Sequence, residues 1–239
     1  MLFTVLLSKL VLLSTAVIAL KAMTLTFIED NINTAFSFDT GDGDPNPTAL
    51  AALPKELYDM PAKLAMIASV ISIFVAVGHL VFICKDWKKG EKTQAYSFRR
   101  NTMFLHLSNF IIILFSLVSI YITHKSSSHF FLRYVMRKAG RPNTEEVRYN
   151  LGRFDLETWS CELKDIPGAR MVKEDYSRQC MVEAAGRWVM IPFMIVSFAV
   201  AVLAVWGMLG GRRDANGERM KTEDVGLEMG KLEGKFNAI

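Results

Sequence analysis

Histidines in two apolar blocks are the residues of this 239-residue chain whose position first suggests chemistry. His79 and His106 lie near the two ends of the basic segment that joins these blocks. Two histidines at a similar depth can bind a metal ion, but the His-x-x-x-His spacing of helical metal sites is absent. We therefore expect a polar contact between neighbouring helices, and we expect the same role for Asn109.

Patterns that indicate catalysis are not found elsewhere in the sequence. Hydrolases and transferases that work inside a membrane need paired carboxylates, histidine clusters or a Ser–His pair at one depth. The chain shows none of these, so we expect a protein that is not an enzyme and has no metal and no cofactor. Its net charge of +4 comes without any nucleic-acid-binding motif, so we expect no nucleic-acid partner.

Two of the three cysteines, Cys161 and Cys180, lie in one polar segment with eighteen residues between them. If that segment is exported, the pair is predicted to form a disulfide, which closes a loop of this length with a stabilisation of roughly 3 kcal/mol. Two free thiols are the alternative. Alternation around Trp159 predicts a short strand or turn that packs on the bridge, and both a buried and a partner-binding role remain open for this ring.

The stretch from His129 to Lys138 is predicted to be helical, with an N-cap supplied by residues 126–128. His129, Arg133 and Arg137 recur every four residues, which places them on one face. The helix either lies on the outer leaflet with its arginines among the headgroups, or caps an outer domain with its apolar side inward. In both cases Arg133 and Arg137 join Trp159 as interaction candidates.

Cys84, the third cysteine, stands where an apolar block meets a basic segment. A cysteine in this position is a candidate for S-palmitoylation. An unmodified thiol at a helix end is the alternative.

The elements that must position these residues are long apolar blocks. The chain is 51% hydrophobic with a mean hydropathy of +0.23, and its apolar residues are concentrated rather than dispersed. Residues 62–84, 102–123 and 188–209 each reach the length of about 20 residues that spans a bilayer. In the last block Pro192 falls near the expected start of the helix, where a missing N–H is tolerated.

A further block, residues 1–28, is interrupted by Lys9 and Lys21. It is either a transmembrane helix whose lysines extend toward opposite interfaces, or a signal peptide with a cleavage site near Ala19. The apolar character of its first residues favours the retained helix. The predicted fold class is an all-α membrane protein, a four-transmembrane-helix bundle with a small disulfide-bonded outer loop domain between spans 3 and 4.

The charge of the segments between the apolar blocks predicts the orientation of the chain in the membrane. Segment 85–101 is basic and is expected in the cytoplasm, whereas segment 29–61 is acidic and is expected to form a flexible outer loop. Segment 124–187 is then an outer loop domain, although it is mildly basic, because loops of this length are translocated largely regardless of charge. The tail, residues 210–239, is predicted to be a disordered cytoplasmic segment.

In its architecture the chain resembles tetraspanins and claudin-like proteins, with both termini inside and a disulfide in an outer loop. The Cys-Cys-Gly motif of tetraspanins is absent, and the Trp-Cys-Cys pattern of claudins belongs to a first outer loop rather than to the segment that holds Trp159, Cys161 and Cys180. The chain also resembles four-span proteins of filamentous fungi in the stretches Trp-Ser-Cys and Ala-Gly-Arg-Trp, around Cys161 and Trp188. No functional residue is carried over from these resemblances.

Together these features predict a non-enzymatic organiser or scaffold of the plasma membrane or secretory pathway. Its expected partners are the lipid bilayer and a membrane or extracellular protein, or surface matrix, bound by the outer loop. Formation of a homo-oligomer is compatible with the sequence. The alternative function is a channel subunit, or an auxiliary subunit of a channel or transporter, for which the sequence offers no filter motif.

Overall fold

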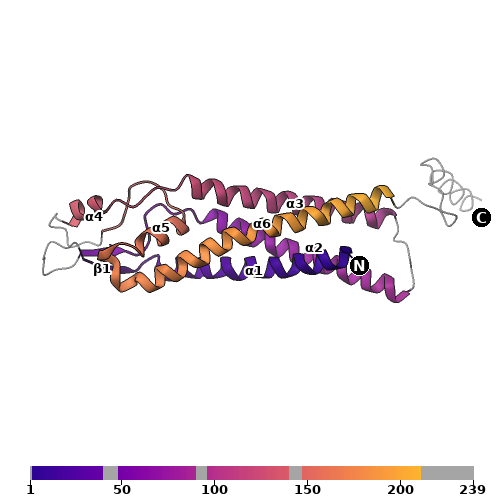
Figure 1. Ribbon diagram of the computed structural model, residues 1–239, viewed down its shortest axis with the longest axis horizontal. Coiled ribbons are helices and arrows are strands. Elements are labelled where there is room, and N and C mark those ends of the chain that lie inside the picture. The colour runs from indigo at the N-terminus through magenta and orange to yellow at the C-terminus, as the bar shows by residue number, and fades with distance from the viewer. Residues whose placement is uncertain (1, 40–47, 90–95, 140–146, 211–239) are drawn as a thin grey trace, which may run out of the picture.

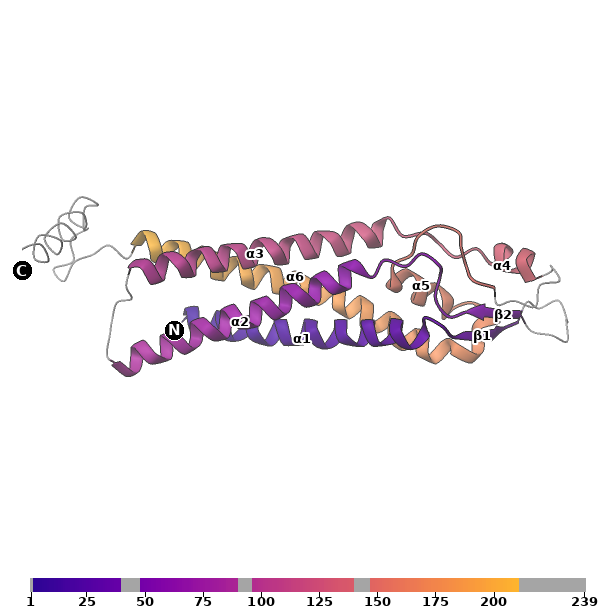
Figure 2. The ribbon, with the colours of Figure 1, turned by 180° about the vertical axis from the view of Figure 1, so that it is seen from behind.

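Four long helices dominate the computed structural model, which describes residues 2–39, 48–89, 96–139 and 147–210. They are α1 (Leu2–Asn31), α2 (Met60–Lys89), α3 (Tyr96–Lys125) and α6 (Lys173–Gly210). The helices lie side by side in an elongated bundle (Figures 1 and 2). Within the described residues all four are long and apolar enough to cross a membrane. The prediction of a multi-pass membrane protein with four helices is confirmed at this level.

The bundle carries apolar side chains both in its interior and on its outer surface, as membrane proteins do. Leu7, Ile113 and Phe193 are fully buried between the helices, while Phe74 and Phe115 are 75% and 65% exposed on the outside. Large exposed apolar side chains along a bundle are expected to face lipid. Along the middle of α2 the buried positions are small residues, which let neighbouring helices approach closely. These small residues are Ala65, Ala68, Ser69, Ser72 and Ala76.

A compact head domain sits at one end of the bundle (Figure 2). We use this name for residues 32–39, 48–58, 126–139 and 147–180. The domain contains the strands β1 (Ala35–Phe38) and β2 (Thr48–Ala51), the helices α4 (Leu132–Ala139) and α5 (Leu156–Leu163), and the 3-10 helix η1 (Pro167–Val172). The two strands are antiparallel, with Phe36 opposite Leu50. We call the opposite end, where α1 and α3 begin and α2 and α6 end, the basic end.

Two segments far apart in the sequence build the head domain together. The backbone N–H of Ala51 donates to the carbonyl of Val147 at 3.0 Å, and the N–H of Val147 donates to Ala49 at 2.8 Å. Similar bonds join Lys55 to Tyr149 and Tyr58 to Phe154. The domain is therefore not made only from the loop between spans 3 and 4, because the segment predicted as a separate flexible loop pairs with it. Residues 40–47 of that segment lie outside the described residues.

Several element boundaries differ from the predicted ones. α6 begins at Lys173, fifteen residues before the predicted start of the last span at 188, so Pro192 lies inside a continuous helix and removes one backbone hydrogen bond there. α4 begins at Leu132 rather than at residue 129. Much of the predicted basic loop, residues 85–89 and 96–101, belongs to α2 and α3. Its centre, residues 90–95, and the predicted disordered tail, residues 211–239, lie outside the described part of the chain.

Candidate functional site

Among the described residues, α4 lies at the end of the head domain away from the bundle (Figures 1 and 2). Arg133 and Arg137 are exposed there, and the adjacent Phe131 and Leu132 are 57% and 41% exposed. Val135 is fully buried and anchors the other side of the helix. We call the four exposed residues the basic tip. Its distance from the bundle favours the second of the two predicted positions for this helix, a cap on the domain with its apolar side inward.

Trp159, the third interaction candidate, lies in the centre of the head domain. It is fully buried among the rings of Phe130, Tyr149 and Phe154, and its Nε1–H donates to the carbonyl oxygen of Ala52 at 2.9 Å. The surrounding segment forms the helix α5, not the predicted strand or turn. The reason is a local cap, since the Asp155 side chain accepts from the N–H of Thr158 at 3.3 Å. Trp159 therefore stabilises the fold and offers no surface to a partner.

The cysteines fall into two classes. Cys161 on α5 is bonded to Cys180 in the first turns of α6, as predicted, so the disulfide fastens α5 to the last long helix. Cys84 is a free, exposed thiol on α2 toward the basic end. Its exposure leaves it accessible to modification, and palmitoylation stays a prediction.

A buried ion pair links α1 to α6 near the head domain. Lys21 is only 3% exposed, and its Nζ lies 2.8 Å from Oε2 of Glu183. The Glu183 carboxylate also accepts hydrogen bonds from Thr24 and from Gln179. The predicted extension of Lys21 toward a membrane interface is therefore wrong, because a counter-charge is available inside the bundle. Lys9, in contrast, is exposed.

A cluster of polar side chains lies where α3, α5 and α6 meet. The imidazole Nδ1 of His124 lies 3.0 Å from Asp155 and 3.8 Å from Glu157. Arg187 donates to both oxygens of Glu157, at 2.9 and 2.7 Å. The ligand atoms of His124, Asp155 and Glu157 lie within 4.8 Å of one another, a spacing that a metal ion can bridge. Because Arg187 engages Glu157 and Asp155 caps α5, we interpret the group as a structural clasp between bundle and head.

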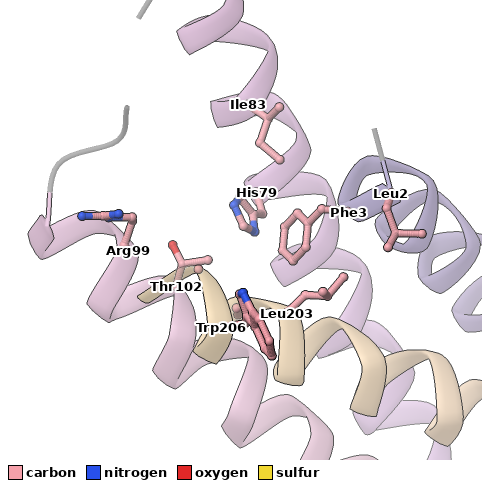
Figure 3. Close-up of a pocket in the computed structure, with 10 residues that line it drawn as sticks. Leu2, Phe3, His79, Ile83, Arg99, Thr102, Leu203 and Trp206 are labelled. Carbon is pink, nitrogen blue, oxygen red and sulfur yellow. The ribbon is translucent and has the colours of Figure 1, made fainter. Parts of the chain in front are cut away.

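A cavity lies at the basic end, between all four long helices. Its volume is about 450 Å³. Figure 3 shows that its residues come from the start of α1 and α3 and from the ends of α2 and α6. Ten residues line this basic-end pocket, namely Leu2, Phe3, His79, Ile83, Arg99, Thr102, Leu203, Ala204, Trp206 and Gly207.

The histidines predicted to meet between helices do so beside this pocket. Nδ1 of His79 lies 2.9 Å from Nε2 of His106, which connects α2 to α3. The ring of Phe3 packs edge-on against both imidazoles, with centroid distances of 5.0 and 6.0 Å. Asn109 likewise contacts the neighbouring helix, since its Nδ2 donates to Ser72 at 3.2 Å. The expected role of all three polar side chains as interhelical contacts is thus seen in the structure.

With this geometry in place, comparison with known proteins adds no family. No family model, no curated protein and no solved structure matches the chain. The class of protein is therefore defined by the architecture alone, as a four-helix membrane protein with a disulfide-bonded head domain.

Sequence reasoning missed three of these features: the ion pair, the clasp and the basic-end pocket. The sequence holds a signal for the ion pair, because a lysine within an apolar block needs a counter-charge and Glu183 lies five residues before the last block. Gly186, one turn after Glu183, leaves room for it, since a Cβ there would stand only 3.2 Å from the Lys21 Nζ. The clasp and the pocket depend on how helix ends converge, which no local pattern encodes.

Proposed function

We propose that this chain is a non-enzymatic membrane scaffold whose head domain binds a protein partner through the basic tip. The observation that carries the proposal is the composition of this surface. Arg133 and Arg137 lie in α4, next to the exposed Phe131 and Leu132, and α4 is at the end of the head domain away from the bundle (Figure 1). Aromatic residues and arginine are the types most enriched at the centres of protein interfaces.

Charge indicates the kind of partner. α4 contains three basic residues and no acidic residue, so its field favours an acidic protein surface. Residues on the far side of α4, above all Val135 and the half-buried Tyr134, hold the helix in place without contributing to the exposed surface. A surface that is fixed before binding loses less conformational entropy on association.

The disulfide supports an exported position of the head domain, because disulfides persist in oxidising compartments. The plasma membrane or the secretory pathway is the proposed location. In this orientation the chain resembles the tetraspanin and claudin-like organisers, which also have four spans and a disulfide outside. The fully buried side chains along the bundle, such as Leu10, Ile113 and Met190, fit a packed scaffold.

A cross-linking experiment tests the proposal. A photoreactive amino acid at position 132 is expected to capture an acidic protein in intact cells, and the double variant R133E/R137E should reduce the captured amount by about tenfold, because each reversed charge repels such a partner. The matched control is R170E/K173E, which reverses two exposed charges elsewhere in the head domain. Equal capture by both double variants, or no capture by the wild type, would contradict the proposal.

A further inference from the structure

The basic-end pocket has the size and the walls of a site for an apolar ligand. Its volume of about 450 Å³ falls within the range of roughly 300–1,000 Å³ that is usual for small-molecule sites. Most of its lining is apolar, and Phe3, Leu203 and Trp206 face the same space (Figure 3). Such walls hold water poorly and match a hydrocarbon chain.

Polar side chains are confined to part of this pocket. His79, Thr102 and Arg99 belong to α2 and α3, and Figure 3 shows Arg99 at the edge opposite Leu2. Among the ten described residues that line the pocket, Arg99 carries a permanent charge, which is positive, and none is acidic. An amphiphile with an apolar chain and an anionic headgroup would complement both parts of the site.

The surroundings supply such a molecule. The pocket lies between helices that are long and apolar enough to cross a membrane, and Lys85, Lys88 and Arg100 are exposed at the same end of the bundle. Basic residues close to a membrane surface attract anionic lipids, each with about 1 kcal/mol. Trp206, which is 73% exposed, is of the type that prefers the headgroup region.

We propose that the basic-end pocket binds an anionic phospholipid, with an acyl chain between Phe3, Leu203 and Trp206 and the phosphate near Arg99. The site lies at the other end of the molecule from the head domain, so the proposal goes beyond the proposed partner binding and does not depend on it. Occupation of the pocket would join the ends of all four helices through one lipid.

Two glycines provide a matched pair of variants for the test. A Cβ added at Gly207 would meet nothing within 4 Å, and Gly207 lines the pocket, so G207L places a side chain in the lipid's space. A Cβ at Gly78 on α2 also meets nothing within 4 Å, but this residue does not line the pocket. G78L therefore controls for the cost of a leucine in a helix. R99Q removes the charge and keeps most of the side-chain length.

Native mass spectrometry of the purified full-length protein provides the readout. Delipidated protein is mixed with dioleoyl phosphatidic acid or with dioleoyl phosphatidylcholine at equal concentration, and the bound fraction is measured. We expect phosphatidic acid to bind about tenfold more tightly than phosphatidylcholine, a ratio that corresponds to 1.4 kcal/mol. G207L should abolish this excess, R99Q should bring phosphatidic acid down to the level of phosphatidylcholine, and G78L should behave as the wild type.

Three results would overturn the proposal. Equal binding of the two lipids by the wild type would mean that only unspecific lipid surrounds the bundle. Undiminished binding by G207L would place the bound lipid elsewhere. Displacement of phosphatidic acid by an equal concentration of glycerol 3-phosphate, which has the headgroup without the chains, would identify the ligand as a free phosphate instead.

Discussion

At the scale of single residues, the Lys21–Glu183 pair is the most consequential contact in the bundle. Both side chains are at least nine-tenths buried, and their charged atoms lie 2.8 Å apart. Removing one member of a buried pair leaves an uncompensated charge and costs about 3–5 kcal/mol. We therefore expect K21M to lower the free energy of unfolding in detergent by this amount, measured by thermal or denaturant unfolding.

The control for this variant is K9M, the same change at an exposed lysine of the same helix. We expect K9M to have little effect and the double variant K21M/E183M to recover most of the stability lost by K21M, because the stranded carboxylate is removed as well. If K21M and K9M were equally stable, Lys21 would not be buried against Glu183.

A second residue-scale prediction concerns the carbonyl oxygen of Ala52, which joins the two segments of the head domain. It accepts from Trp159 Nε1 at 2.9 Å and from the Tyr176 hydroxyl at 2.6 Å. Y176F removes one of these bonds and is expected to cost roughly 1–2 kcal/mol of head-domain stability. Y134F, which removes the hydroxyl of a half-buried ring in the same domain, is the control. A larger loss in Y134F than in Y176F would contradict the assigned bond.

Burial in the head domain also keeps the hydroxyl group of Tyr149 protonated. The pKa of the Tyr149 hydroxyl is raised because burial disfavours the phenolate. The group accepts the backbone N–H of Phe131 at 3.0 Å. Because the folded-state pKa lies above the unfolded value, stability from the neutral phenol is present at neutral pH and at pH values up to the unfolded pKa. We expect no loss of head-domain stability from this group at physiological pH.

At the scale of elements, the disulfide is expected to decide how firmly α5 is held against α6. Replacing both cysteines in C161S/C180S removes a covalent tie that closes a short loop, with an expected loss of roughly 3 kcal/mol. Hydrogen exchange of residues 147–172 should accelerate in this variant and in reduced wild-type protein. The C84S variant is the control, because Cys84 is a free thiol outside the head domain. Unchanged exchange in C161S/C180S would show that packing alone holds α5.

The elements also show what could be predicted from sequence. The long helices and the disulfide follow from local signals, namely apolar block length and two cysteines in one segment. The pairing of β2 with Val147 could not be predicted, because the strand has only four residues and Val147 stands about a hundred residues away in the sequence. The early start of α6 could not be predicted, because its first turns are polar and polar residues before an apolar block are typical of a loop.

Some features of the candidate sites can be predicted from sequence, and others cannot. Arg133 and Arg137 were found because a four-residue spacing on a short helix is visible in the sequence, and their exposure agrees with it. The sequence leaves two roles open for Trp159, because its burial depends on an aromatic cluster that is assembled from distant residues. The basic-end pocket has no sequence signal, since its lining comes from the ends of four helices.

At the scale of the whole molecule, α1 is an integral part of the bundle. Leu7, Leu10 and Val17 are fully buried against the other helices, and cleavage near Ala19 would remove all three from the mature protein. We propose that α1 is retained, in agreement with the preferred sequence interpretation. Intact mass spectrometry of the purified protein is expected to show a chain that includes residues 2–19, and a mass that lacks them would contradict the proposal.

We propose that the head domain and the basic end lie on opposite sides of a membrane, with the head domain outside. This arrangement is tested most directly by labelling single cysteines, R133C in α4 and K88C at the end of α2, in a C84S background. An impermeant thiol reagent applied to intact cells is expected to label R133C, whereas K88C should react only after permeabilisation. Labelling of K88C with protection of R133C would contradict the account, because the head domain and its disulfide would then lie in the cytoplasm.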